Sequence, residues 1–252
     1  MLGVLIPTYD RADLLNDALE SVAVNMSRVS YEILIYDDGS TDHTGAVVES
    51  WRERTGCVRL LKGEDNRGVS FARNQMLQSL SPKTEYVVFL DSDDQLVPGR
   101  IEADLKRLAD NPDADFTYGL LRLISHEKLQ AQDFSDCEVV RGSSLSSATF
   151  RREILDRVGL LDESFQQAED TDYLLRVAEL TQDFILHDDV VFNYRRHTEN
   201  VSDNRAQLRA GMMRAFLRHA QRRRLDPSLF DANKLLGKDA QVLINAKSET
   251  EK

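Results

Sequence analysis

Short apolar runs alternate with amphipathic segments through the first half of the chain. Four runs rich in Val, Ile and Leu, bounded by Pro, Gly or Asp-Gly, predict buried strands at Leu2–Ile6, Glu32–Tyr36, Val58–Leu61 and Tyr86–Leu90. Apolar residues at helical spacing follow the first strand over 14–26. The same spacing precedes the fourth strand over 69–80 and follows it over 101–108. Alternating strands and helices predict a parallel sheet with helices on both faces.

The second half of the chain has a less regular pattern. Strand-like segments are Phe116–Leu123, Val139–Arg141, Phe184–His187 and Val190–Tyr194, and helices are expected near Arg151–Val158 and Thr171–Leu180. We interpret this half as the completion of one domain over residues 1–203. Residues 204–252 are predicted to form a C-terminal extension, with a basic helix to Leu225, a shorter helical segment and the polar tail Lys247–Lys252.

Composition narrows the class of protein. The 252 residues are 41% hydrophobic and 30% charged, as in a globular protein, and the net charge of −11 argues against nucleic-acid binding. Cys57 and Cys137 lie far apart without a CxxC pattern, which predicts neither a zinc site nor a disulfide framework and favours a cytoplasmic location. No run approaches the roughly 18 apolar residues of a membrane span. Any membrane contact is therefore expected to be peripheral.

Acidic residues follow three of the four predicted strands. Ligands of open parallel sheets bind at the carboxyl ends of the strands, so these positions are candidates for chemistry. The segments are Pro7-Thr8-Tyr9-Asp10, Asp37-Asp38-Gly39-Ser40 and Asp91-Ser92-Asp93-Asp94. Three carboxylates within four residues repel one another unless a cation compensates, which favours Mg²⁺ or Mn²⁺ at the last segment. The alternatives are a solvated acidic turn there and a helix cap at Ser40–Asp42.

Three other positions carry candidate chemistry. Arg73 lies one turn into a helix that opens at Gly68, where its guanidinium could reach a diphosphate or simply face water. Glu169 and Asp170 begin a helix, which suits the helix dipole as well as a general base. His197 follows an apolar strand and is either structural or part of a metal site.

Taken together, these motifs resemble the family 2 glycosyltransferases. The resemblance covers roughly residues 1–203 and rests on segments in the family's order: Pro7-Thr8-Tyr9-Asp10, Asp37-Asp38-Gly39-Ser40, Asn66-Arg67-Gly68 with Ala72-Arg73-Asn74, Asp91-Ser92-Asp93, Glu169-Asp170 and Tyr194-Arg195-Arg196-His197. It implies a GT-A fold, a Rossmann-like and mostly parallel α/β sheet flanked by helices. It also implies a nucleotide-binding half over about 1–95 and an acceptor-side half over about 96–203.

The resemblance assigns roles residue by residue. Asp170 would be the catalytic base, Asp93 and His197 would bind the metal, and the remaining residues would bind substrate. Those substrate-binding residues are Pro7, Thr8, Tyr9 and Asp38 around the nucleoside with Asp10 beside them, Arg73 near the nucleotide-sugar, Asp91 and Ser92 near the ribose or donor sugar, and Glu169 beside the base.

The implied reaction is an inverting transfer of a sugar from a nucleotide diphosphate-sugar, with UDP favoured, to an acceptor hydroxyl. The acceptor would be a glycan or glycolipid in polysaccharide, lipopolysaccharide or other glycoconjugate synthesis, and the cofactor Mn²⁺ or Mg²⁺. The absence of membrane-spanning runs sets the chain apart from family members that embed in the bilayer and secrete polymers. The implied location is the cytoplasm, with a peripheral position at the inner face of the membrane as a second interpretation.

Two other functions fit parts of the pattern. An apolar strand that ends in Asp-x-Asp also describes an aspartate-dependent, phosphatase-like hydrolase, although such a motif is expected after the first strand. A sugar-nucleotide binding module without catalysis is the other alternative. A dinucleotide-binding site and a P-loop are not predicted, because neither of their glycine-rich motifs occurs in the sequence.

The predicted helix over 205–225 is locally basic within an acidic chain. It carries seven arginines and no acidic residue, with Leu208, Met212 and Phe216 along one stripe. One interpretation is a contact with an anionic membrane surface or an acidic partner. The other is a helix docked on the domain through its apolar stripe, with the arginines in water.

Overall fold

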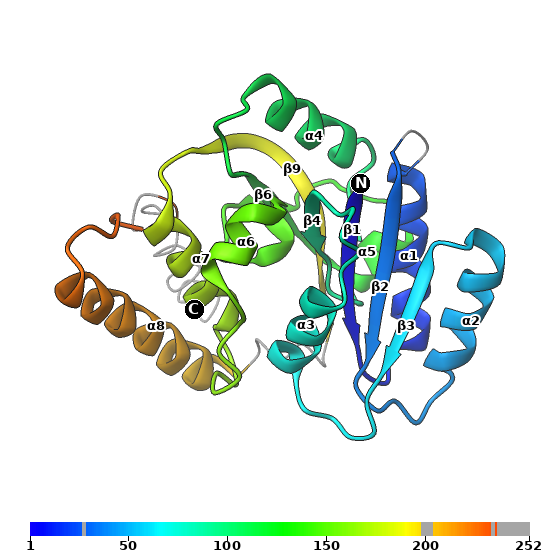
Figure 1. Cartoon of the computed structure of the whole chain (residues 1–252). Coiled ribbons are helices and arrows are strands. Elements are labelled where there is room, and N and C mark those ends of the chain that lie inside the picture. Colours follow the sequence, from blue (N-terminus) through cyan, green and yellow to red (C-terminus); the bar gives the residue numbers. More distant parts are fainter. Residues whose placement is uncertain (27–28, 198–203, 233–234, 236–252) are drawn as a thin grey trace.

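The structure is a computed structural model of the whole chain, and it describes residues 1–26, 29–197, 204–232 and 235. One twisted central sheet runs through the molecule, with helices on both of its faces (Figure 1). The first half contains β1 (Leu2–Thr8), α1 (Ala12–Asn25), β2 (Tyr31–Asp37), α2 (Thr44–Thr55), β3 (Val58–Lys62), α3 (Val69–Gln78), β4 (Tyr86–Phe89) and β5 (Gln95–Leu96).

The predicted parallel sheet is confirmed in this half. β1 lies between β2 and β4 and is parallel to both, with Leu5 in register with Leu34 and Phe89. β3 extends the sheet in parallel beyond β2. All seven residues of β1 are buried because helices cover both faces, which explains why its sequence is a continuous apolar run.

The second half completes the sheet with strands in both directions. Its elements are α4 (Arg100–Asp110), β6 (Phe116–Ser125), α5 (His126–Gln130), β7 (Glu138–Val140), the 3-10 turn η1 (Leu145–Ser147), β8 (Ala148–Arg151), α6 (Arg152–Val158), α7 (Glu169–Leu180), β9 (Phe184–Arg196) and α8 (Arg205–Leu225). β8 is antiparallel to both β4 and β6, whereas β9 is parallel to β6. The order across the sheet is β3-β2-β1-β4-β8-β6-β9-β5, with β7 on β6.

Some local predictions needed correction in the second half. The two apolar segments predicted as separate strands at 184–187 and 190–194 form the single strand β9, whose pairing with β6 shifts register near Gly119. The side chains of Val191 and His187 occupy the space that a Cβ at Gly119 would need. The sequence analysis also missed β8, because a four-residue buried strand leaves no periodic signal.

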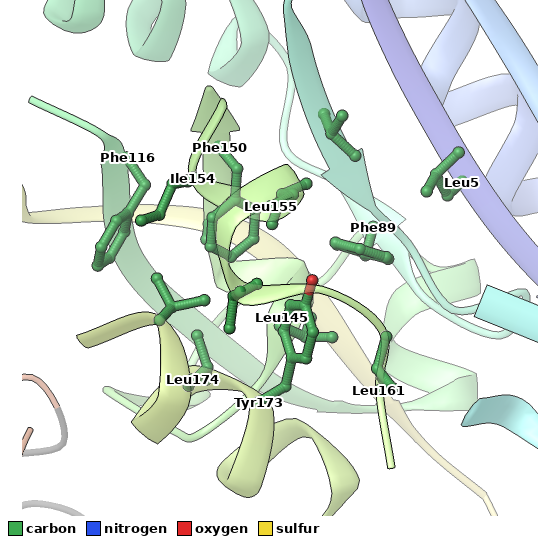
Figure 2. Close-up of a cluster of buried hydrophobic side chains, with 14 of the residues drawn as sticks. Leu5, Phe89, Phe116, Leu145, Phe150, Ile154, Leu155, Leu161, Tyr173 and Leu174 are labelled. Atoms are coloured by element: carbon green, nitrogen blue, oxygen red, sulfur yellow. The ribbon is translucent and has the colours of Figure 1, made fainter. Parts of the chain in front are cut away.

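A buried apolar cluster joins the two halves beneath the carboxyl edge of the sheet (Figure 2). Phe116 stacks on Phe184 at a centroid distance of 5.0 Å and lies 5.6 Å from Phe150. Tyr173 and Leu174 of α7 pack into the same cluster. This packing fixes the start of α7 next to the strands of the first half.

The C-terminal helix α8 lies along α7 (Figure 1). Met212 and Ala215 are buried, and Gly211 approaches so closely that an added Cβ would lie 2.4 Å from the carbonyl oxygen of Gln167. The docked interpretation of this helix is therefore the one seen.

The expectation that its arginines stand in water was wrong for four of the seven. Arg214 donates to Ser164, and Arg218, Arg222 and Arg223 form ion pairs with acidic side chains. Arg205, Arg209 and Arg224 are exposed.

None of the helices in the described part of the chain is long and apolar enough to cross a membrane. The predicted domain boundary at residue 203 and the polar tail Lys247–Lys252 lie outside the described residues.

Candidate active site

A cavity of about 470 Å³ opens at the carboxyl ends of β1, β2 and β4. Its volume lies within the range of small-molecule sites, about 300–1,000 Å³. The start of α3, the start of α7 and Leu208 of α8 close its other sides. The lining residues are Pro7, Thr8, Tyr9, Arg11, Asp38, Asn66, Gly68, Val69, Ala72, Arg73, Asp91, Asp93, Ser143, Ser144, Gln166, Gln167, Ala168, Glu169, Asp170, Thr171, Tyr194 and Leu208.

Arg73 stands at the centre of an acidic cluster in this cavity. Its side chain is 1% exposed, and its Nη1 donates to Asp170 Oδ1 at 2.5 Å and to Glu169 Oε1 at 3.2 Å. Its Nη2 donates to Asp91 Oδ1 at 2.7 Å. A buried guanidinium thus joins carboxylates from β4 and α7, which are separated by more than 70 residues in the sequence. The structure thus brings Asp91, Glu169 and Asp170 together on one guanidinium.

The two acids at the start of α7 occupy different environments. Burial, together with the charge of Asp170, raises the pKa of Glu169 from its ordinary 4.5 to about 7, against the opposing charge of Arg73. Asp170 is held through both oxygens, because Oδ2 also accepts a hydrogen bond from Leu145 N at 2.8 Å. The carboxyl group of Asp170 is therefore held in one orientation at the cavity surface.

A second cluster surrounds Asp93. Arg11 Nη1 lies 2.8 Å from Asp93 Oδ2 and 2.9 Å from His197 Nε2, and Asp93 Oδ2 lies 3.1 Å from His197 Nε2. Burial alone would raise the pKa of Asp93. The hydrogen bond with His197 and the charge of Arg11 lower this pKa by more, so the net shift is downward. Asp94, the third acid of the segment, instead accepts from Arg195 N at 2.9 Å and is 1% exposed.

The donor set at Asp93 fits a divalent metal. Neighbouring ligands of an octahedral ion with bonds of about 2.1 Å lie about 3.0 Å apart, which matches the 3.1 Å between Asp93 Oδ2 and His197 Nε2. Mg²⁺ and related ions are commonly held by one or two protein ligands plus substrate phosphates. Within the described residues no cluster of three or more His, Cys, Asp or Glu side chains could hold a metal. Asp93 and His197 would therefore supply two ligands and leave the remainder to substrate or water.

Two predicted nucleoside residues are engaged with the protein backbone. Asp38 is 4% exposed, and Oδ2 accepts from Gly68 N at 2.7 Å and from Arg67 N at 3.0 Å, so it fixes the turn that opens α3. Asp10 adopts a positive φ of 47° and accepts from Thr41 N at 2.7 Å. Such backbone conformations are uncommon outside Gly and cluster at functional sites. Ala168, with φ 65°, marks the opposite side of the cavity directly before Glu169.

Most of the predicted site residues share this cavity. Asp10, Ser92 and His197 are not among its lining residues, although His197 contacts Asp93. Ser92 is buried at 6% exposure. The helix that follows Asp38 begins at Thr44, and its N-cap residue is His43, not one of the residues Ser40–Asp42. Asp42 Oδ1 accepts a hydrogen bond from Thr44 N and supports this turn from the position before the N-cap.

The sequence analysis missed several lining residues. Arg11 follows the first acidic segment, and a basic residue beside so many acids is the signal that could have identified it. Ser143 and Ser144 come from an irregular loop before η1 and leave no comparable signal. Ser143 Oγ lies 2.9 Å from Thr171 Oγ1 and thereby ties this loop to α7.

Comparison with solved structures identifies the fold as that of GT-A glycosyltransferases. A mannosyltransferase from Pyrobaculum calidifontis, solved with GDP-Man and Mn²⁺, aligns over 97% of this chain and 70% of its own, with a TM-score of 0.72 and 21% identity. The S. aureus protein TarS (residues 1–349) in complex with UDP-GlcNAc aligns over 98% and 76%, with a TM-score of 0.70 and 16% identity. The predicted fold class is confirmed.

The chain belongs to glycosyl transferase family 2, whose model matches residues 3–159. An uncharacterised Haemophilus influenzae glycosyltransferase is 24% identical over 71% of this chain and 62% of its own length. The Escherichia coli UDP-Glc:alpha-D-GlcNAc-diphosphoundecaprenol beta-1,3-glucosyltransferase WfgD is 24% identical over 81% of each chain. The Bacillus subtilis putative teichuronic acid biosynthesis glycosyltransferase TuaG is 31% identical over 42% of this chain and 41% of its own. The chain thus spans less than two thirds of several relatives.

Proposed function

We propose that this chain transfers a sugar, with inversion, from a nucleotide diphosphate-sugar to an acceptor hydroxyl in glycoconjugate synthesis. The observation that supports the proposal best is the meeting of Asp91, Glu169 and Asp170 on the buried Arg73, beside Asp93 in the same cavity. Acids from two distant stretches of chain thereby face one cavity. Family membership supports the reaction class, and we propose that the reaction takes place in this cavity.

In the proposed reaction Asp170 takes the proton of the acceptor hydroxyl. The acceptor oxygen forms a bond to the anomeric carbon as the bond from that carbon to the diphosphate oxygen breaks, and the diphosphate leaves with the electron pair. This single displacement inverts the anomeric configuration. Arg73 and Leu145 N hold the carboxylate of Asp170 in place, which limits the number of orientations it can adopt.

Asp93 and His197 would hold the divalent metal. When bound, the metal would offset the negative charge that develops on the leaving diphosphate, a contribution of several kcal/mol. The neighbour solved with Mn²⁺ and GDP-Man supports a metal at such a site. We favour a UDP-sugar as donor, because WfgD carries UDP-Glc in its name and TarS was solved with UDP-GlcNAc.

A panel of donors tests the proposal. UDP-, GDP- and dTDP-sugars are incubated with the protein and Mn²⁺ or Mg²⁺, and release of the nucleoside diphosphate is measured, because many transferases transfer slowly to water. We expect metal-dependent release from one nucleotide class, which Asp93→Asn abolishes. Donor binding without transfer or release would favour the binding module, and a phosphoryl group trapped on Asp91 would favour the hydrolase.

We also propose that the outer face of α8 contacts an anionic membrane surface that carries a lipid-linked acceptor. Met213 and Leu217 are 62% and 57% exposed there. Arg205 and Arg209 precede them at four-residue spacing, and Arg224 follows Leu217 by seven residues, which places all three arginines on the same helix face. An apolar stripe flanked by arginines suits the interface of an anionic bilayer. The name of WfgD, which includes a diphosphoundecaprenol, supports such an acceptor.

Sedimentation with vesicles tests this surface. We expect the protein to sediment with phosphatidylglycerol vesicles but not with phosphatidylcholine vesicles, and the triple substitution of Arg205, Arg209 and Arg224 by Gln to abolish it. Substituting Arg52 and Arg54 of α2 and Arg59 of β3 by Gln removes the same charge at the opposite end of the molecule (Figure 1) and serves as the control. Sedimentation that is independent of anionic lipid would remove the proposal.

A further inference from the structure

Three side-chain atoms from distant stretches of chain form a nearly equilateral triangle at one corner of the cavity. The sides are 2.8 Å from Arg11 Nη1 to Asp93 Oδ2, 2.9 Å from Arg11 Nη1 to His197 Nε2 and 3.1 Å from His197 Nε2 to Asp93 Oδ2. The three side chains are 17%, 18% and 13% exposed, respectively. Arg11 therefore touches both of the atoms that suit a metal.

The hydrogen-bonding capacities of the three groups do not allow all three contacts to be favourable. An arginine nitrogen only donates, an ionised carboxylate only accepts, and an imidazole nitrogen does one or the other. If His197 Nε2 accepts from Arg11, two acceptor atoms face each other across the side to Asp93. If Nε2 carries a proton and donates to Asp93, two donors face each other across the side to Arg11. One side of the triangle opposes the others in either state.

A divalent cation removes this conflict. A metal takes a lone pair from the carboxylate and a lone pair from the neutral imidazole at the same time. The 3.1 Å separation of Oδ2 and Nε2 is already close to the separation of about 3.0 Å expected of neighbouring ligands on an octahedral ion. The guanidinium lies against both atoms, so it cannot stay in contact with both lone pairs once they bind a metal.

We propose that Arg11 is the resident counter-cation of the metal site, which holds Asp93 and His197 together without metal and is displaced when the divalent cation binds. Arg11 is thus a positioning residue whose positive charge lowers the affinity of the site for the divalent cation. The inference rests on the metal site in the proposed function and does not depend on which sugar is transferred. Its consequence is weak metal binding until the guanidinium is released.

Titration with Mn²⁺ alone tests the inference without turnover. Free Mn²⁺ is measured by electron paramagnetic resonance for the wild type, Arg11→Gln and a control, Arg67→Gln. Arg67 stacks on Phe71 and does not contact Asp93, so its substitution removes the same charge near the cavity without changing the metal site. We expect Arg11→Gln to bind Mn²⁺ at least about tenfold more tightly, since a competing unit charge is removed at contact distance, and Arg67→Gln to change it less than about twofold.

The possible outcomes separate the inference from the proposed function. Equal or weaker Mn²⁺ binding by Arg11→Gln, with binding by the wild type that Asp93→Asn abolishes, would overturn the inference and leave the metal site standing. Absence of Mn²⁺ binding in the wild type and in Arg11→Gln would overturn both. Tighter binding by both arginine variants to the same extent would reduce the effect to net charge and also overturn it.

A second measurement detects metal bound to the wild type, so it does not depend on how Arg11→Gln folds. Electron spin echo modulation of bound Mn²⁺ detects a coordinated imidazole nitrogen. We expect this signal in the wild type and its loss in His197→Gln, because the metal replaces Arg11 at Nε2. Mn²⁺ bound at Asp93 without nitrogen coupling would mean that Arg11 keeps its contact with His197, and the inference would fail.

Discussion

The two halves of the molecule build their sides of the cavity in different ways. In residues 1–95, part of the lining lies at the ends of parallel neighbouring strands, so the sheet itself brings Thr8, Asp38 and Asp91 to one edge, and the start of α3 adds the rest. In residues 96–197, the lining residues come from a loop, the start of a helix and the end of a long strand. Side-chain contacts hold this second wall, including Asn74 of α3 with Leu161 N at 2.8 Å.

The difference shows where the site tolerates change. A wall made by strand order is preorganised by the backbone ladder, whereas a wall made by packing depends on individual contacts. The contact of α8 with the start of α7 belongs to the second kind, through Gly211 and through Arg222, which donates to Asp172 at 3.2 Å. Substitutions in the second wall should therefore couple stability to activity.

The largest effect is expected at Asp170. Asp170→Asn should lower kcat by about 10²–10⁴-fold, the usual contribution of a general base, with donor affinity changed by less than about threefold. Steady-state rates and calorimetric donor titration measure the two quantities. Asp113→Asn is the matched control, because it makes the same change at an exposed residue outside the cavity. Loss of donor binding with normal turnover of the bound fraction would contradict the assignment.

A smaller effect concerns Glu169 and depends on pH. The pKa of Glu169 is about 7 in the folded protein against an ordinary value of 4.5, so the fold favours its protonated form. The stability that this group contributes is fully present below about pH 4.5 and is lost as the pH rises through 7. The free energy of unfolding of Glu169→Gln should therefore equal that of the wild type at pH 4.5. At pH 8 it should be higher than that of the wild type by about 3 kcal/mol at most. Urea unfolding without metal measures the difference.

The exposed Glu53 on α2 offers a control for that measurement. Glu53→Gln should leave the difference from the wild type independent of pH. If Glu169→Gln is no more stable than the wild type at pH 8, the carboxylate of Glu169 is not destabilised by its surroundings, and the electrostatic account of this cluster is wrong.

Two helical glycines compare the halves directly. Gly45 in α2 has no atom within 4 Å of an added Cβ, whereas a Cβ at Gly211 would meet the Gln167 carbonyl oxygen at 2.4 Å. Gly45→Ala should stabilise the protein by about 0.5–1 kcal/mol, and Gly211→Ala should destabilise it by about 1–3 kcal/mol. Thermal unfolding gives both values. Equal shifts in the two variants would show that α8 does not press on the loop before α7.

The strands of the first half could be predicted from the sequence because their burial on both faces makes them continuous apolar runs. The acids at their ends could be predicted too, since parallel strands end at the same edge. The second half gave weaker signals. β8 is too short for periodicity, and β9 contains the exposed residues Asp188 and Asp189 at its centre, which divided its pattern in two.

The sequence alone determined the family, the alternation of strands and helices, and which acids stand at the strand ends. The tertiary structure decided which charges meet. The spacing of Arg73, Asp91 and Asp170 in the sequence does not predict that they are in contact. Arg11 contacts Asp93 and His197, which lie 82 and 186 positions further along the chain. Local patterns record how each segment is buried, whereas contacts between distant segments depend on the packing of the whole sheet and its helices.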